Sequence, residues 1–201
     1  MDFWQYEKEA IAQGYATVCG CDEAGAGPLA GPVYAAAVIL PLGVDIPGLD
    51  DSKKLTEKRR EVLFPVIQEK ALHWSVAWVE AKEIDETDIL SARMRAMQLA
   101  IDGLSQAPDF VLIDGNRDKG KSACITTLHR CVVKGDSLSA SMAAASVLAK
   151  VSRDRFMKKM AEQYPEYRFD KHKGYGTKLH YKLLRAYGPC PIHRRTFLKN
   201  L

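Results

Sequence analysis

The 201-residue sequence contains no run of the roughly 18 apolar residues that a membrane-spanning helix requires. Its first ten residues, MDFWQYEKEA, carry acids and lack the basic start and apolar run of a secretory signal. No internal repeat or low-complexity linker divides the chain, so we expect a single domain. These absences predict a cytoplasmic protein with no membrane partner.

Cysteine is scarce, and the five cysteines lack the paired spacing of a zinc site. Cys19 and Cys21 form a C-x-C pair that no second pair follows. We therefore expect free, buried thiols. His172, His180 and His193 are also too far apart for the usual zinc spacing, which places them in turns or beside phosphates.

The net charge is only +4, but it is unevenly distributed along the chain. From residue 150 to the end there are 14 Lys and Arg against 4 Asp and Glu, so that segment carries +10 and residues 1–149 carry −6. The same segment holds eight of the 17 aromatic residues. Basic residues interleaved with rings are typical of a nucleic-acid surface, although a solvated helical face has the same composition.

Strand and helix patterns alternate along the chain. One helix is predicted to begin after an N-cap at Thr87, and its apolar residues recur at steps of 4, 3, 4 and 3. The expected strands are 17–21, 33–40, 72–79, 110–113 and 131–133, and the other long helices are 56–70 and 139–163. This order predicts an α/β sheet with a helical C-terminal extension.

Two segments match phosphate-binding loops in letters only. GAGPLA (Gly25–Ala30) fits the dinucleotide fingerprint, but Pro28 removes an N–H and a strand pattern follows where a helix is required. GNRDKGKS (Gly115–Ser122) fits the P-loop, but the β-branched residues after it leave no room for a crossover helix. We expect a basic surface loop here and no nucleotide cofactor.

Four carboxylates stand at expected strand ends: Asp22, Glu23, Asp114 and Asp136. Clustered carboxylates repel one another unless a cation lies among them, and oxygen ligands suit Mg²⁺ or Mn²⁺. Adjacent strand residues point to opposite faces, so Asp22 and Glu23 share a site only if the strand ends or bulges there. The neighbouring glycine turn permits that, whereas four separate solvated turn residues are the alternative.

The motifs CDEAGAGPLAGPV, DSKKLT, LIDGN, VKGD with AAASVLAKVSRD, HKGYGT and GPCPIHRRTF occur in this order between Gly20 and Phe197. The series resembles that of bacterial type 2 ribonuclease H, the ribonuclease HII family. The resemblance implies a ribonuclease H-like mixed sheet flanked by helices, with a catalytic core at 1–165 and a basic helical extension at 166–201 within one domain. A monomer is expected.

The resemblance also implies cleavage of RNA paired to DNA, and cutting 5′ to ribonucleotides embedded in duplex DNA, with 3′-hydroxyl and 5′-phosphate products. Asp22, Glu23, Asp114 and Asp136 fall on the family's metal-binding positions. Two Mg²⁺ or Mn²⁺ ions about 3.5–4 Å apart would then bracket the scissile phosphate. Asp154 lies in mid-helix and is expected to form a salt bridge instead.

Substrate contacts carried over from the family fall on the glycine turn and on Tyr175, which would recognise the ribose 2′-hydroxyl. The turn is Gly25, Ala26 and Gly27, and Ala26 stands where the family has arginine, so one cationic contact to phosphate is missing. Ser52, Lys53 and Lys173 are further expected contacts to nucleic acid.

Two other functions fit part of this pattern. A junction resolvase-like or integrase-like nuclease of the same fold would use similar acids without distinguishing ribose from deoxyribose. A non-catalytic nucleic-acid binding module would keep the basic segment and need no metal.

Overall fold

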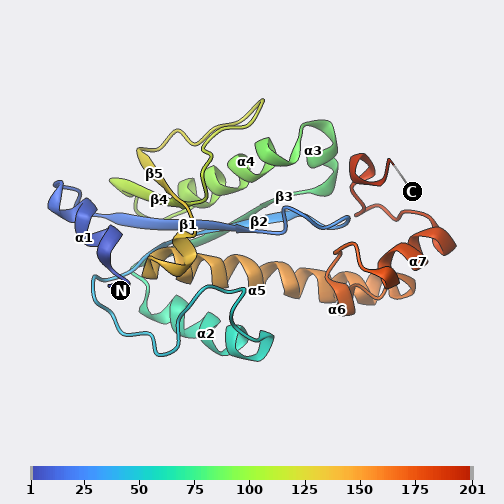
Figure 1. The fold of residues 1–201 in the computed structure, drawn as a ribbon, viewed down its shortest axis with the longest axis horizontal. Helices are drawn as coiled ribbons and strands as arrows, with labels where there is room; N and C mark the ends of the chain where they lie inside the picture. The colour runs from blue at the N-terminus through green and yellow to red at the C-terminus, as the bar shows by residue number, and fades with distance from the viewer. Residues whose placement is uncertain (1, 200–201) are drawn as a thin grey trace.

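The computed structural model describes residues 2–199. Its centre is a five-stranded mixed sheet in the order β3-β2-β1-β4-β5. The strands are β1 (Val18–Ala24), β2 (Val33–Ile39), β3 (His73–Val79), β4 (Phe110–Asp114) and β5 (His129–Val132). The first three pair antiparallel, while β4 and β5 add in parallel beside β1, as Figure 1 shows.

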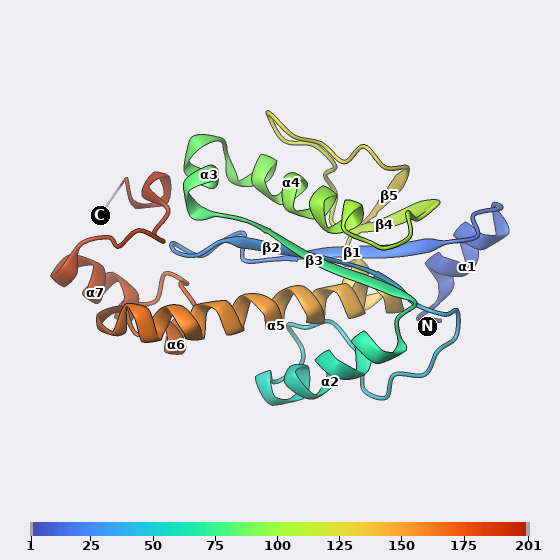
Figure 2. The same ribbon diagram turned by 180° about the vertical axis from the view of Figure 1, so that it is seen from behind.

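Helices cover both faces of this sheet (Figures 1 and 2). One face packs against α4 (Ile89–Asp102), whose Met94, Met97 and Ile101 are buried against Cys19 and Cys21. The other face packs against α5 (Ala140–Gln163) and α2 (Glu57–Lys70). Because β2 is buried on both faces, its sequence is a continuous apolar run without alternation.

The long helix α5 approaches β1 closely. A Cβ on Gly20 would overlap the backbone of Ser141 and Met142. Small residues in the first turns of α5, such as Ala143 to Ala145, are fully buried and allow the same approach. The N-terminus of α5 therefore lies directly against the central strand β1, and the one-turn helix η1 (Gly135–Ser137) before it packs beside β4.

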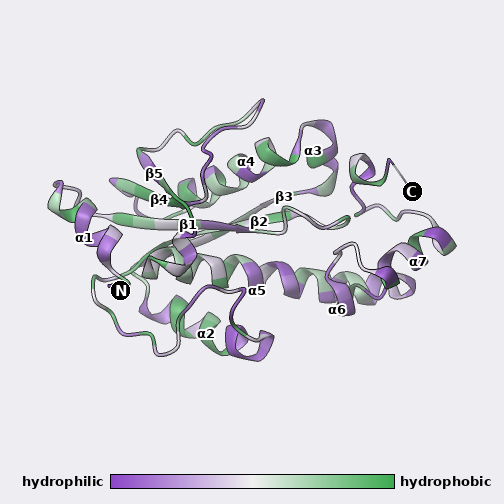
Figure 3. Cartoon of the chain, in the orientation of Figure 1, coloured by the Kyte–Doolittle hydropathy of each residue, from purple (hydrophilic) through white to green (hydrophobic). Residues whose placement is uncertain are grey.

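The C-terminal segment packs on the far half of α5. It comprises η2 (Pro165–Tyr167), α6 (Phe169–His172), α7 (Lys178–Tyr187) and η3 (Arg195–Leu198) around an apolar cluster that includes Met157 and Phe169. Figure 3 shows many hydrophilic residues along α7 and the far half of α5. The predicted helical extension is thus present, and the boundary at residue 165 stays a prediction. The remaining helices are α1 (Gln5–Ala12) and α3 (Ala81–Glu86).

The predicted elements occur with shifted ends. The predicted N-cap at Thr87 was wrong, because the Thr87 hydroxyl donates to the Glu83 carbonyl and closes α3. Asp88 caps α4 instead, accepting hydrogen bonds from the backbone N–H groups of Leu90 and Ser91. The segment Gly115–Ser122 opens no helix and lies in the irregular connection between β4 and β5, as expected.

The cysteine and histidine predictions held in part. All five cysteines are free thiols, but Cys124 is exposed and Cys131 is only half-buried, so the prediction of burial was wrong for those two. The histidines His172, His180 and His193 are buried together. His193 closes a turn from Cys190, as expected, whereas His172 and His180 lie in α6 and α7. Among residues 2–199, no helix is long and apolar enough to cross a membrane.

Candidate active site

Three carboxylates from separate segments meet on the α5 side of the sheet. Asp22 lies on β1, Asp114 ends β4, and Asp136 lies in η1 immediately before α5. Each offers an oxygen within 4.8 Å of the others. Asp114 also orders the turn that carries Asp136, because its Oδ1 accepts hydrogen bonds from the N–H groups of Gly135 (2.6 Å) and Asp136 (3.3 Å).

Burial and mutual repulsion act on these acids. Asp22 is 3 % exposed. Its pKa is raised well above the usual range, first by loss of solvation and second by the negative charges of Glu23 and Asp114. Burial likewise raises the pKa of Asp114, although hydrogen bonds from Asp136 and Gly135 oppose the shift. Such a cluster is unfavourable as it stands, and a bound cation would relieve it.

Glu23 points away from this cluster. We expected the strand to end or bulge at Asp22 and Glu23, but β1 continues to Ala24 in unbroken register with β2. The side chain of Glu23 therefore lies on the α4 side, where its Oε1 is 2.7 Å from Arg93 Nη2. The backbone pairing of β1 with β4 ends at Cys21. At Glu23, the edge of β1 that faces β4 is therefore unpaired.

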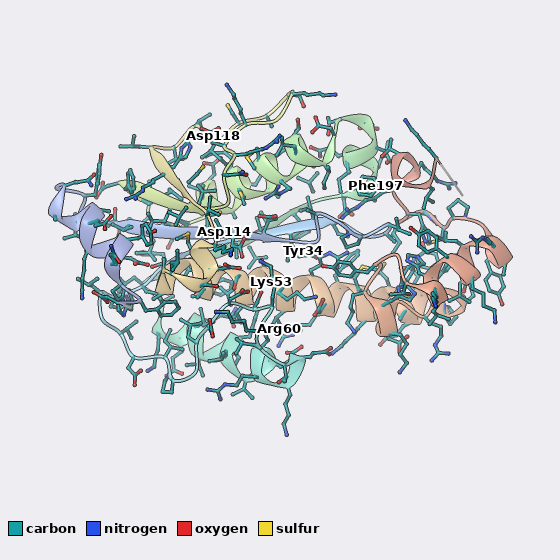
Figure 4. The ribbon with its side chains drawn as sticks, viewed as in Figure 1. Tyr34, Lys53, Arg60, Asp114, Asp118 and Phe197 are labelled. Atoms are coloured by element: carbon teal, nitrogen blue, oxygen red, sulfur yellow. The ribbon has the colours of Figure 1, made fainter. Side chains whose placement is uncertain are left out.

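Lys53 supplies a cation to the cluster. Its Nζ lies 2.8 Å from Asp136 Oδ2, and Figure 4 labels Asp114 at the level of the sheet and Lys53 below it, toward α2. Burial lowers the pKa of Lys53, but the hydrogen bond with Asp136 and the charge of Asp22 outweigh it and raise the pKa overall. The neighbouring Ser52 is buried, and its N–H donates to Ser146 Oγ at 3.2 Å.

A cleft of about 230 Å³ joins these residues to the glycine turn and Tyr175. The predicted residues that line it are Asp22, Glu23, Gly25, Ala26, Gly27, Ser52, Lys53, Asp114 and Tyr175. Lys173 does not line it, because its ammonium bonds to the Asp170 carbonyl and lies 3.8 Å from Glu57. Lys150 of α5 lines it instead, with its Nζ 5.8 Å from the centre of the Tyr175 ring.

Two buried arginines support the glycine turn from beneath. Arg194 is 0 % exposed and donates to the carbonyls of Gly25 (2.6 Å), Ala26 (2.8 Å) and Gly31 (2.9 Å). Arg153 is also 0 % exposed and donates to the carbonyls of Ala30, Pro32 and Lys173. Gly25 has a φ of +97°, and a Cβ there would overlap the Arg153 side chain.

Neither arginine has a carboxylate partner within 4.0 Å in the described part of the chain. Burial lowers the pKa of both guanidinium groups, and Arg153 lowers that of Arg194 further. An arginine nevertheless stays charged, so two positive charges without a directly paired carboxylate lie behind the turn. The motif GPCPIHRRTF contains Arg194, but nothing in its spacing indicates that this arginine is the buried one.

The acid cluster fits a divalent metal. Its members are carboxylates only, from three separate segments, and the pKa of the buried Asp22 is raised well above its usual range. Hard oxygen donors of this kind match Mg²⁺ or Mn²⁺ and exclude the sulfur and nitrogen sets that zinc favours. Asp154 is not part of the cluster: it pairs with Lys150 at 2.6 Å and with Arg60 at 3.6 Å, as predicted.

A mixed sheet flanked by helices, with acids gathered where parallel strands end beside a long helix, defines the ribonuclease H-like class of nucleases. The family model described as Ribonuclease HII matches residues 19–200. The chain belongs to the ribonuclease HII family. It is an endoribonuclease of the ribonuclease H type, a hydrolase of phosphodiester bonds in RNA paired to DNA.

Individual relatives agree with this assignment. Ribonuclease HII of Caldicellulosiruptor saccharolyticus is 49% identical over 200 residues, covering 100% of this chain and 96% of the relative. Ribonuclease HII of Idiomarina loihiensis is 53% identical over 180 residues, covering 90% and 94%. The crystal structure of ribonuclease H2 from Pyrococcus horikoshii superposes with a TM-score of 0.73 at 28% identity, covering 90% of this chain and 93% of that one.

Proposed function

We propose that this chain, with Mg²⁺ or Mn²⁺, cuts the RNA strand of RNA–DNA hybrids and also cuts 5′ to single ribonucleotides embedded in duplex DNA. The products would carry 3′-hydroxyl and 5′-phosphate ends. The observation that supports the proposal is one cleft in which a carboxylate cluster, a glycine turn and the Tyr175 ring face the same space.

Asp22, Asp114 and Asp136 would hold the metal, and Glu23 lines the same cleft from the opposite face of β1. Bound divalent ions activate water for attack on phosphorus and stabilise the leaving oxygen. The protein's own part is to bring three carboxylates to one point and to hold the scissile phosphate beside them. No side-chain nucleophile is required.

The other side of the cleft would recognise the ribose. The 2′-hydroxyl is the group that distinguishes RNA from DNA, and it can donate and accept hydrogen bonds. In this proposal, backbone groups of Gly25 to Gly27 contact that hydroxyl while the half-exposed Tyr175 ring packs against the sugar. Lys53 and Lys150 bring positive charge to the same cleft for the neighbouring phosphates.

The test is a cleavage assay with three 5′-labelled duplexes: DNA with one ribonucleotide, an RNA–DNA hybrid, and DNA alone. With Mg²⁺ or Mn²⁺ we expect cutting of the first two, 5′ to the ribonucleotide in the first, and no cutting of DNA alone. Chelation of the metal should stop the reaction.

Each other outcome contradicts the proposal in a distinct way. Cutting of all three duplexes would indicate a nuclease that does not distinguish ribose from deoxyribose. Binding without cutting under every metal condition would indicate a non-catalytic module. Cutting of the hybrid alone would support the activity on RNA–DNA hybrids and contradict the proposed cleavage at single ribonucleotides.

A further inference from the structure

Three histidines of the C-terminal segment form a buried group directly behind Tyr175. His172, His180 and His193 are 7 %, 0 % and 2 % exposed. The rings of His172 and His180 stack with centroids 4.2 Å apart at 17°, and His180 Nε2 lies 2.9 Å from His193 Nε2. None of the three lines the catalytic cleft, so the proposed chemistry leaves them without a role.

The group is not arranged to bind a metal. Within residues 2–199, the acid cluster is the only set of three or more His, Cys, Asp or Glu side chains whose ligand atoms lie within 4.8 Å of one another. Every ring nitrogen of the three histidines already has a hydrogen-bond partner in the protein. All of their ring nitrogens are therefore engaged in hydrogen bonds within the protein.

The hydrogen bonds of His193 and His180 fix the position of each ring proton. The N–H of Cys190 donates to His193 Nδ1 at 2.9 Å, so the proton of His193 must be on Nε2. That Nε2–H points at His180 Nε2, which must accept, so His180 carries its proton on Nδ1. His180 Nδ1–H then donates to the carbonyl oxygen of Tyr175 at 3.0 Å.

His172 holds Gly174, the residue before Tyr175, in the same manner. The N–H of Gly174 donates to His172 Nδ1 at 3.2 Å, and His172 Nε2–H donates to the Tyr167 carbonyl at 2.8 Å. Gly174 has a φ of +84°, and a Cβ there would overlap the Ala30 carbonyl, so this loop is tightly confined. Histidine rings thus hold the backbone on the N-terminal side of Tyr175 and the carbonyl of Tyr175 itself.

This arrangement requires all three rings to be neutral. A second proton on His193 would point at the N–H of Cys190, and one on His180 would point at the Nε2–H of His193. Burial lowers the pKa of all three rings, to about 4 for His180 and His193. The charged neighbours are Asp170 and Lys173 beside His172 and Arg195 beside His193, while Cys190 contacts His193 as a thiol.

We propose that His180, oriented by His193, is a positioning residue for Tyr175, and that this neutral histidine chain sets how tightly a ribonucleotide-containing duplex is bound. The inference rests on the proposed function, because Tyr175 is its ribose-contacting residue. The histidine chain holds the Tyr175 carbonyl together with the Thr177 N–H, which donates to the same oxygen at 2.8 Å, and the backbone held in this way directs the ring into the cleft. Loss of the hydrogen bond from His180 to the Tyr175 carbonyl should weaken substrate binding more than it slows the chemical step.

The first test needs no activity. Nitrogen-15 NMR of the wild-type protein at pH 7 distinguishes the two neutral tautomers and the charged form of each histidine. We expect the Nδ1–H form for His180 and the Nε2–H form for His172 and His193. An Nε2–H or charged His180 would overturn the inference.

The second test compares His180→Leu with His180→Asn, because the asparagine side-chain nitrogen can replace Nδ1 as donor to the Tyr175 carbonyl and leucine cannot. For duplex DNA with one ribonucleotide, we expect the leucine variant to raise KM about five- to tenfold, as expected for one lost buried hydrogen bond, with kcat within about twofold. The asparagine variant should recover most of that loss. His73→Asn on β3 is the matched control and should leave KM unchanged.

His193→Asn provides the same test if the leucine variant does not fold. It keeps an acceptor for the Cys190 N–H and removes the donor to His180 Nε2, so we expect a less firmly held His180 ring and a raised KM, while the Tyr175 carbonyl still selects the Nδ1–H form of His180. Unchanged KM in the folded variants, or equal losses for asparagine and leucine at position 180, would overturn the inference. Failure of the wild-type protein to cut this duplex would instead contradict the proposed function.

Discussion

Lys53 Nζ donates a 2.8 Å hydrogen bond to Asp136 Oδ2, so an ammonium group occupies part of the space where a metal would be held. The Lys53 side chain is 73 % exposed, whereas that of Asp136 is 4 % exposed. Lys53 is therefore free to leave the cluster toward solvent or nucleic acid, while Asp136 stays in place.

From this pair we predict that Lys53→Met binds Mn²⁺ about three- to tenfold more tightly than the wild type in the absence of nucleic acid. The reason is that the ammonium no longer competes with the metal for Asp136. Calorimetric titration measures the affinity. Lys54→Met is the control, since Lys54 bonds to Asp50 outside the cluster; equal Mn²⁺ affinity in the wild type and both variants would contradict the prediction.

Replacing Asp22 should separate stability from activity. Asp22→Asn removes a buried charge whose pKa is raised by burial and by neighbouring acids, so we expect the free energy of unfolding of the metal-free protein to rise by about 1–3 kcal/mol. Cleavage should be lost while duplex binding remains. Denaturant titration and gel-shift measurements check the two parts, with Asp118→Asn as an exposed control; full turnover in Asp22→Asn would show that the metal site is misplaced.

Ala26→Arg should restore a cationic contact on the glycine turn. One added phosphate contact should tighten binding and steepen the slope of log affinity against log salt by about one unit. Ala26→Gln adds length without charge and should keep the wild-type slope. Binding measured at several salt concentrations decides the matter, and equal slopes for Ala26→Arg and the wild type would rule out the contact.

Arg194→Met should disturb the turn from below. The variant leaves the carbonyls of Gly25, Ala26 and Gly31 without their guanidinium donor, so we expect a loss of about 2–4 kcal/mol in the free energy of unfolding and a raised KM. Arg195→Met is the adjacent control, because the side chain of Arg195 is exposed. Similar denaturation midpoints for the two variants would contradict a supporting role for Arg194.

Acid should destabilise the fold through the buried histidines. The pKa values of His180 and His193 are about 4 in the folded protein and about 6.5 when unfolded, so between these values the unfolded chain binds more protons. Stability is full above pH 6.5 and falls toward pH 4, by at most about 3 kcal/mol for each histidine.

Asp22 acts in the opposite direction, because its raised pKa means that acid neutralises an unfavourable charge. The measurement is therefore best made in the Asp22→Asn background, by denaturant titration between pH 7 and pH 4. Adding His193→Asn should reduce the pH dependence. An undiminished dependence would show that the carboxylates with lowered pKa values cause the loss.

The acid cluster was predictable because each of its three members follows a recognisable strand or motif. The orientation of Glu23 was not, because it depends on how far β2 continues to pair with β1, which the glycines alone do not specify. The sequence also could not indicate that Lys173 lies outside the cleft lining, because its left-handed backbone turns the side chain toward Asp170 and Glu57. Local patterns located the chain segments but not the directions of these side chains.

The residues that support the cleft were harder to predict. Arg153 and Arg194 are fully buried, although arginine is ordinarily exposed, and they meet at the turn only after α5 and the C-terminal segment pack together. The histidine group likewise joins three segments around His172, His180 and His193. Sequence spacing argued correctly against zinc there, but it carries no information on rings that come together by packing.

Gly20 has a further consequence for the acids. Because it has no side chain, the start of α5 can lie against β1, and Asp136 just before α5 comes within reach of Asp22, two residues further along that strand. A methyl group at position 20 would push the helix outward and move one carboxylate away from the other two. The arrangement of the three carboxylates that would bind a cation thus depends on the absence of a Cβ at Gly20, a residue outside the acid cluster.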